Sequence, residues 1–149
     1  MHAWLVMTKA MQAITRYALA NLEETGLGLS DFAVLEALLH KGPLPVNVIG
    51  PKVNLTPGSI SVAVDRLVSK GLVSRAECSQ NRRVRIVALP PHGESVIKPI
   101  FRAHVETMEN VFAGLSRQEL RQLEQQLKRV GKLAESLFER RVEKGHAGE

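Results

Sequence analysis

The chain has 149 residues, 44% of them hydrophobic, and a formal net charge of +5 at pH 7. This length fits one globular domain, and the composition excludes a disordered chain. No apolar run approaches the about 18 residues that span a bilayer, the single cysteine cannot form an internal disulfide, and the five histidines lack metal-ligand spacing. We therefore expect a cytoplasmic protein that has no membrane segment and needs no cofactor or metal.

Basic residues concentrate in the middle of the chain. The segment 51–89 holds seven basic and two acidic residues, and the difference equals the whole formal excess of the protein. The basic residues are Lys52, Arg66, Lys70, Arg75, Arg82, Arg83 and Arg85. Such a stretch suits an anionic polymer, because each neutralised phosphate releases counterions. The alternative is a solvated basic face.

Two helices are predicted in the first 42 residues. Apolar residues recur at helical spacing up to about Glu23, and Gly26 marks their end. A second helix is expected over residues 31–40, with Ser30 as its N-cap and Gly42 after its last turn. Both helices are amphipathic, so each should bury one face.

Two more helices should follow in close succession. Pro45 suits the first turn of a short helix, which residues 50–51, Gly then Pro, should fray or bend. Thr56 can cap the next helix, Pro57 sits at its first position, and Gly71 can close it. The residues expected to face the core are Ile60, Val64 and Leu67, and those expected nearer the surface are Ser59, Ser61, Val62, Asp65 and Arg66.

A hairpin is predicted next, with strands over residues 73–77 and 83–89. The segment "NRRVRIVAL", residues 81–89, carries three arginines and no acidic residue. Side chains alternate between the two faces of a strand. Arg83 and Arg85 should therefore share one face, and Val84 and Ile86 should point toward the core.

The C-terminal third should form two long helices. Pro99 predicts a kink or local break in the first of them. Ser116 and Glu119 form a capping box at the start of the second. That helix carries an apolar seam at coiled-coil spacing, made of Leu120, Leu123, Leu127, Val130, Ala134 and Leu137. The seam packs either within one chain or against a second copy, and the length of the helix favours a second copy.

A short helix, the connection "NLT", a second helix and a hairpin follow the order of a winged helix-turn-helix. With "VDRLVSKGLVSR", "NRRVRIVAL" and "LPPHG", residues 29–93 resemble the MarR family of bacterial transcription regulators. The resemblance implies a mainly α fold with a small β-hairpin wing and long N- and C-terminal dimerisation helices. It places a DNA-binding lobe at residues 30–90 and a dimerisation lobe at 1–26 and 91–143, within a single domain of residues 1–149.

The resemblance also implies a function and a set of contact residues. Members of the family are usually homodimeric repressors that a small, often aromatic or phenolic, ligand or thiol oxidation releases from double-stranded DNA. The recognition helix would contact DNA through Thr56, Ser59, Ser61 and Val62, reading mainly shape and methyl groups. Arg83 would act from the wing, helped by Arg82 and Arg85. Arg66 could touch DNA beside Asp65, although a carboxylate near phosphates more often orients an arginine.

Two other functions are considered for the same sequence. A winged-helix module could bind a protein through its basic face, and it would then bind duplex DNA weakly at every sequence. An enzyme is disfavoured because the chain has no nucleophile with a base at motif spacing, no glycine-rich phosphate loop and no metal set. Cys78 is expected to be an ordinary thiol, since no neighbour in sequence obviously lowers its pKa.

Overall fold

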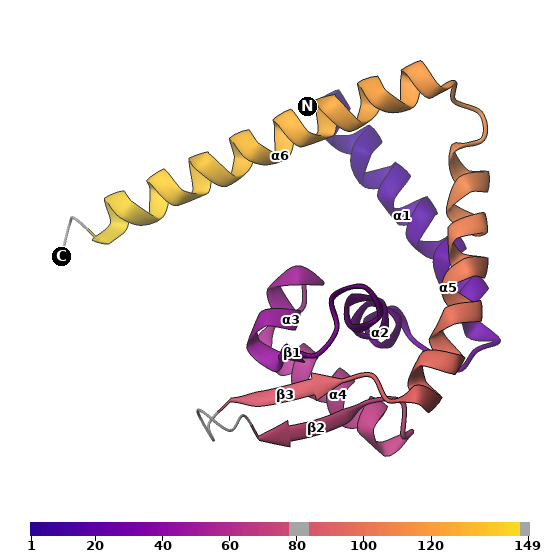
Figure 1. Cartoon of the computed structure of the whole chain (residues 1–149). Helices are drawn as coiled ribbons and strands as arrows, with labels where there is room; N and C mark the ends of the chain where they lie inside the picture. Colours follow the sequence, from indigo (N-terminus) through magenta and orange to yellow (C-terminus); the bar gives the residue numbers. More distant parts are fainter. Residues whose placement is uncertain (78–83, 147–149) are drawn as a thin grey trace. The chain divides into compact units, whose positions relative to one another are not determined.

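The computed structural model describes residues 1–77 and 84–146, with side chains up to residue 143. The elements in chain order are α1 (His2–Glu23), α2 (Leu29–Lys41), β1 (Leu44–Pro45), α3 (Val46–Lys52), α4 (Pro57–Ser69), β2 (Ser74–Glu77), β3 (Arg85–Ala88), α5 (Pro91–Phe112) and α6 (Arg117–His146) (Figure 1). The mainly α fold with a small antiparallel sheet confirms the prediction. None of the helices described here combines the length and apolarity needed to cross a membrane.

The chain divides into two compact units, Met1–Met108 and Glu109–Glu149. The first unit holds α1 to α4, the three strands and most of α5, and the second holds the end of α5 and all of α6. The division of residues 30–90 from 1–26 and 91–143 into a DNA-binding and a dimerisation lobe stays a prediction.

The helix α2 begins at Leu29, two residues before the predicted start. Gly28 is the N-cap, and the amide of Phe32 donates to its carbonyl at 3.0 Å, so Ser30 lies inside the first turn. The predicted N-cap was therefore wrong. The Ser30 hydroxyl instead accepts a hydrogen bond from Arg66 at 3.1 Å. Gly42 ends the helix as predicted, with a φ of 72° and its amide bonded to Leu38.

The short helix α3 runs through Gly50 and Pro51 to Lys52, so the expected fraying does not occur. The reason is tertiary packing. A β-carbon added at Gly50 would lie 3.2 Å from the carbonyl oxygen of Leu55 and 3.3 Å from a methyl group of Ile60. Glycine thus allows α3 to approach the start of α4 closely, and this contact supports the helix past its proline.

The N-terminus of α4 has the predicted cap. Thr56 is the N-cap, its Oγ1 accepts from the amide of Ser59 at 3.2 Å, and Pro57 is the first helical residue. Gly71 follows the helix with a φ of +67°, a conformation that costs glycine little. The residues expected in the core are buried and those expected at the surface are exposed.

The sheet has the strand order β1-β3-β2, with both pairs antiparallel. The two-residue strand β1 was not predicted, because a proline such as Pro45 is typical of the first turn of a helix. Arg75 pairs with Val87 and Glu77 pairs with Arg85, so these four side chains project from one face. Val87 is fully buried, whereas Ile86 on the other face is only half-buried. The predicted inward face of β3 was therefore wrong, and Arg85 shares its face with the core residue Val87.

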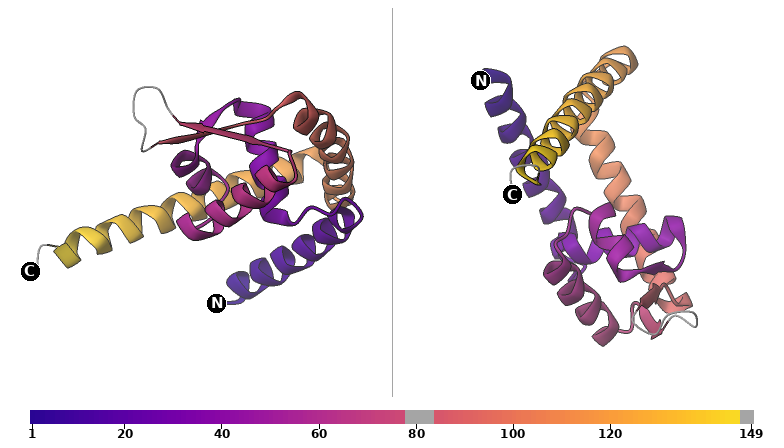
Figure 2. Two further views of the ribbon diagram at one scale, coloured as in Figure 1. Left: turned by 90° about the horizontal axis from the view of Figure 1, so that it is seen from below. Right: turned by 90° about the vertical axis from the view of Figure 1, so that its left-hand side faces the viewer.

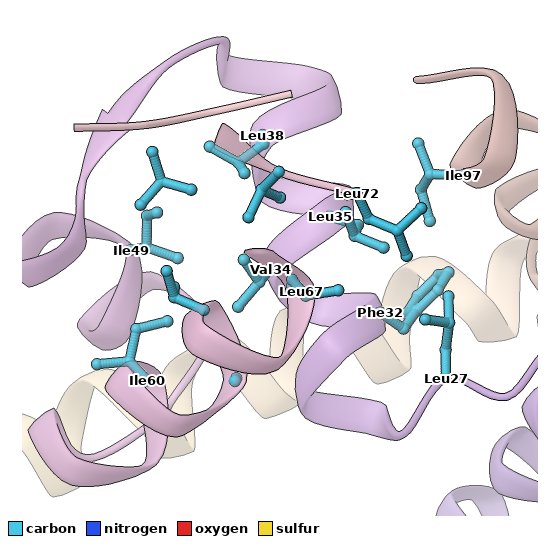
Figure 3. Packing of buried hydrophobic residues seen from close by; sticks show 14 of the residues in the cluster. Leu27, Phe32, Val34, Leu35, Leu38, Ile49, Ile60, Leu67, Leu72 and Ile97 are labelled. Atoms are coloured by element: carbon cyan, nitrogen blue, oxygen red, sulfur yellow. The ribbon is translucent and has the colours of Figure 1, made fainter. Parts of the chain in front are cut away.

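One hydrophobic core holds the first unit together. Figure 3 shows side chains from α2, α3, α4 and α5 pointing toward one another, and Figure 2 shows α2, α3 and α4 gathered beside the strands from two further directions. The fully buried members include Leu22, Val34, Leu35, Ile49, Val64, Leu67, Val87 and Ile97. Each large aliphatic side chain stabilises the fold by about 1.5 to 3 kcal/mol relative to exposure, which fixes the position of α4 beside the sheet.

The helix α5 continues without interruption through Pro99, so the expected local break does not occur. Proline removes one backbone donor from a helix. Here Ile97 is fully buried, and Ile100 and Phe101 pack against the same core on the other side of the proline. Packing on both sides therefore maintains the helix.

In the second unit, α6 is preceded by the predicted capping box. The amide and hydroxyl of Ser116 donate to Glu119 Oε2 at 2.8 and 2.7 Å, and the amide of Glu119 donates back to the serine hydroxyl at 3.3 Å. These bonds lower the pKa of Glu119, because they favour the ionised carboxylate. The helix α6 that follows is 30 residues long.

Candidate nucleic-acid interface

The exposed side of the first turns of α4 is small and uncharged. It consists of Thr56, Ser59, Ser61 and Val62, all exposed, which we call the outer face of α4. The Thr56 and Ser59 hydroxyls lie 2.8 Å apart and are hydrogen-bonded to each other. The Ser61 hydroxyl donates to the carbonyl of Pro57 at 2.9 Å. A helix with so little side-chain bulk can approach another surface closely.

Arg66 lies further along α4 and is held by a carboxylate from α2. Its Nε lies 2.9 Å from both oxygens of Asp31, and its Nη2 lies 2.6 Å from Oδ1. The Asp31 side chain is only 2% exposed, and that of Arg66 is 43% exposed. The hydrogen bonds to Asp31 and its negative charge raise the pKa of Arg66. Lys70 adds a second positive charge 3.9 Å from Asp31.

Asp65 orients an arginine as expected, but its partner is Arg75 on β2 and not its neighbour Arg66. Arg75 Nη1 lies 2.6 Å from Asp65 Oδ1. Adjacent residues on a helix point about 100° apart, so Asp65 and Arg66 reach different elements. The ion pair joins α4 to the base of the hairpin.

Arg85 on β3 also has an acidic partner. Its Nη1 lies 3.0 Å from Glu77 Oε1 on β2, and both side chains are about half exposed. The segment that looked unbalanced in sequence thus receives a carboxylate from the neighbouring strand. Arg82 and Arg83, together with Cys78, lie outside the described residues.

A hollow of about 490 Å³ separates α3 and α4 from the strands. Its floor is apolar and includes Leu55, Ile60 and Val64, and its rim includes Arg75 and Arg85. This volume lies within the range of small-molecule sites, about 300 to 1,000 Å³. Across the described residues no group of three or more His, Cys, Asp or Glu side chains could hold a metal ion.

Sequence reasoning missed Asp31, although a signal was present. Asp31, Val34, Leu35 and Leu38 follow helical spacing, which places the carboxylate on the same face as three core residues. An acidic residue at such a position needs a cation. The partner could not be identified from the sequence, because Arg66 is 35 residues away.

The comparisons with known proteins agree with this geometry. A model of the MarR family matches residues 27–84. The HTH-type transcriptional regulator MhqR of Bacillus subtilis is 34% identical over 128 residues, which cover 86% of this chain and 88% of that protein. The chain belongs to the MarR family. It is a DNA-binding transcription regulator, and its relatives in the MarR family are regulators and not enzymes.

Solved structures of the MarR family share the fold. The regulator Sco3205 of Streptomyces coelicolor, solved in complex with DNA, has a TM-score of 0.82 at 20% identity, and covers 87% of this chain and 84% of its own. Bordetella bronchiseptica BpsR, whose DNA binding is regulated by 6-hydroxynicotinic acid, has a TM-score of 0.80 at 18% identity, and covers 88% of this chain and 99% of its own.

Proposed function

We propose that α4 is the recognition helix of this regulator and that its outer face enters the major groove of DNA. The observation that carries the proposal is the outer face itself, four small or apolar exposed residues at the capped end of a rigidly packed helix. The arginines of the hairpin supply positive charge beside it. Sco3205, a family member of similar fold, was solved bound to DNA.

The wing arginines are proposed to contact the phosphate backbone or the adjacent minor groove. Arg85 is half exposed, and an exposed ion pair such as that with Glu77 is worth only about 0 to 1 kcal/mol, so DNA can compete for it. Arg82 and Arg83 keep the roles that the family resemblance implies. Arg66 is proposed to act mainly by fixing α4 on α2, because Nε and Nη2 already donate to Asp31.

Binding to duplexes selected from a random pool tests this proposal. Ser61→Glu should abolish specific binding, because a carboxylate would lie against the bases. Arg83→Ala should weaken binding to every sequence and make the dependence of log K on log salt shallower by about 0.9 if it removes one phosphate contact. Unchanged affinity in both folded variants would contradict the proposal and favour a protein-binding module.

We further propose that the regulator acts as a homodimer. In the second unit α6 exposes an apolar row along its length, including Leu123, Leu127, Val130, Leu133, Leu137 and Phe138. In the first unit α1 exposes Trp4, Leu5, Val6 and Met11. Exposed apolar rows of this kind mark association surfaces. A second copy of the chain would cover the rows on α1 and α6. Leu127→Asp should shift the sedimentation of the protein toward the monomer, and a monomeric wild type at micromolar concentration would contradict the proposal.

Release by a small aromatic or phenolic ligand is the last part of the proposal. The hollow between α4 and the strands has a ligand-sized volume, an apolar floor and two arginines at its rim, which suits an aromatic acid. A ligand there would contact α4 and the hairpin together, so it could change their spacing. Titration of the protein–DNA complex with aromatic acids, including 6-hydroxynicotinic acid, tests this part, and Val46→Phe, at a half-buried position of the lining, should block the effect by filling the hollow.

A further inference from the structure

The hydroxyl of Ser61 is oriented by a hydrogen bond within α4. A serine hydroxyl carries one proton, and here that proton is donated to the Pro57 carbonyl, which can only accept. The side chain is exposed, so the lone pairs of its oxygen remain accessible from outside the helix. While this bond is kept, Ser61 offers a partner an acceptor of hydrogen bonds and not a donor.

Val62, the next residue of α4, adds an apolar contact about 100° around the helix from Ser61. Its side chain is 59% exposed although it lies in a well-packed helix. A β-branched residue in a helix adopts essentially one side-chain rotamer, so the two methyl groups of Val62 are held in place. The Thr56 and Ser59 hydroxyls are bonded to each other within the cap. The first two turns of α4, all of which the structure describes, carry no lysine or arginine.

Only one kind of base pair matches both properties in the major groove. An acceptor suits the amino group of adenine or cytosine, and an apolar side chain suits the 5-methyl group of thymine. An A·T pair presents an amino group and a methyl group together, whereas a G·C pair presents an amino group without a methyl group. Guanine would require a donor such as arginine.

We infer that Ser61 and Val62 form a reader of A·T base pairs, in which Ser61 accepts from the adenine amino group and Val62 packs on the thymine methyl group. This inference rests on the proposed function, because it requires α4 to lie in the major groove. It assigns to these two residues the base preference of the regulator.

Base analogues in a selected duplex test each contact separately. Deoxyuridine in place of thymine removes only the 5-methyl group, and 2-aminopurine in place of adenine still pairs with thymine but moves the amino group out of the major groove. Each 5-methyl group that deoxyuridine removes should weaken wild-type binding by about fourfold, so replacing one thymine in each of the two half-sites should weaken it by about 16-fold. Val62→Ala, which removes both γ-methyl groups, should show a smaller difference in affinity between the two duplexes than the wild type, and Val62→Thr, which keeps one γ-methyl group, should show an intermediate difference.

The adenine contact has its own control. 2-Aminopurine should weaken binding of the wild type and leave Ser61→Ala unaffected, and thermal melts should show that each variant remains folded. The inference is overturned, while the proposed function stands, if deoxyuridine can replace every thymine without any loss of wild-type affinity. It is also overturned if the replacement lowers the affinity of Val62→Ala as much as that of the wild type. Failure to select any duplex overturns the proposed function and the inference with it.

Discussion

Removing Arg66 should destabilise the protein through the carboxylate that it leaves behind. In Arg66→Met the chain keeps its hydrophobic stem, but Asp31, only 2% exposed, loses the donors that lie 2.6 to 2.9 Å from its oxygens. Breaking one side of a buried ion pair costs about 3 to 5 kcal/mol. Arg66 is partly exposed and Lys70 remains 3.9 Å from Asp31, so we expect a loss of stability below that range, about 2 to 3 kcal/mol.

Urea unfolding followed by circular dichroism measures this loss. The free energy of unfolding should fall by the amount given above, and the melting temperature should fall by about 2 to 4 °C per kcal/mol. The double variant Asp31→Leu with Arg66→Met is the control. It removes both charges, so it should be more stable than Arg66→Met alone. Equal stability of Arg66→Met and the wild type would refute the reasoning that the buried carboxylate depends on this arginine.

The pH dependence of this pair follows from the raised pKa of Arg66. A base whose pKa is higher in the folded state stabilises the fold fully below its ordinary pKa and loses that contribution only as pH rises through the folded value. The ordinary pKa of arginine already lies far above neutral pH, so titration of Arg66 should leave stability unchanged across neutral pH. A loss of the stability difference between wild type and Arg66→Met between about pH 7 and 10 would contradict this.

Three further outcomes are expected. Gly93→Ala should destabilise the fold by about 1 to 3 kcal/mol in urea unfolding, because its β-carbon would lie 2.0 Å from the carbonyl oxygen of Leu72, whereas Gly58→Ala, with nothing within 4 Å, should not. The capping box should contribute fully above about pH 4.3, the ordinary pKa of glutamate, and weaken as pH falls through the lower folded pKa of Glu119; amide exchange at the start of α6 should show this in the wild type and not in Glu119→Gln. Glu77→Gln should free its arginine partner, tighten DNA binding and steepen the salt dependence by up to about 0.9, and an unchanged slope would exclude that arginine from the phosphate contacts.

Local signals in the sequence determined the helices and several of their ends. Thr56, Pro57 and Gly71 predicted both ends of α4, because capping and turn formation involve residues within one turn of each other. The capping box of α6 was predicted for the same reason. The family resemblance depended on these elements in their order along the chain, so the winged-helix fold and the candidate outer face of α4 were also accessible from sequence.

Tertiary structure decided which residues meet across the chain. It assigned Arg66 to Asp31 and Asp65 to Arg75, turned Val87 and not Ile86 toward the core, and added β1 to the sheet. Each outcome depends on contacts between different elements and not on the pattern within one of them. Local periodicity predicts that a strand has two faces, but the neighbouring elements decide which face is buried. It likewise shows that a buried carboxylate needs a cation, but a neighbouring element supplies that cation.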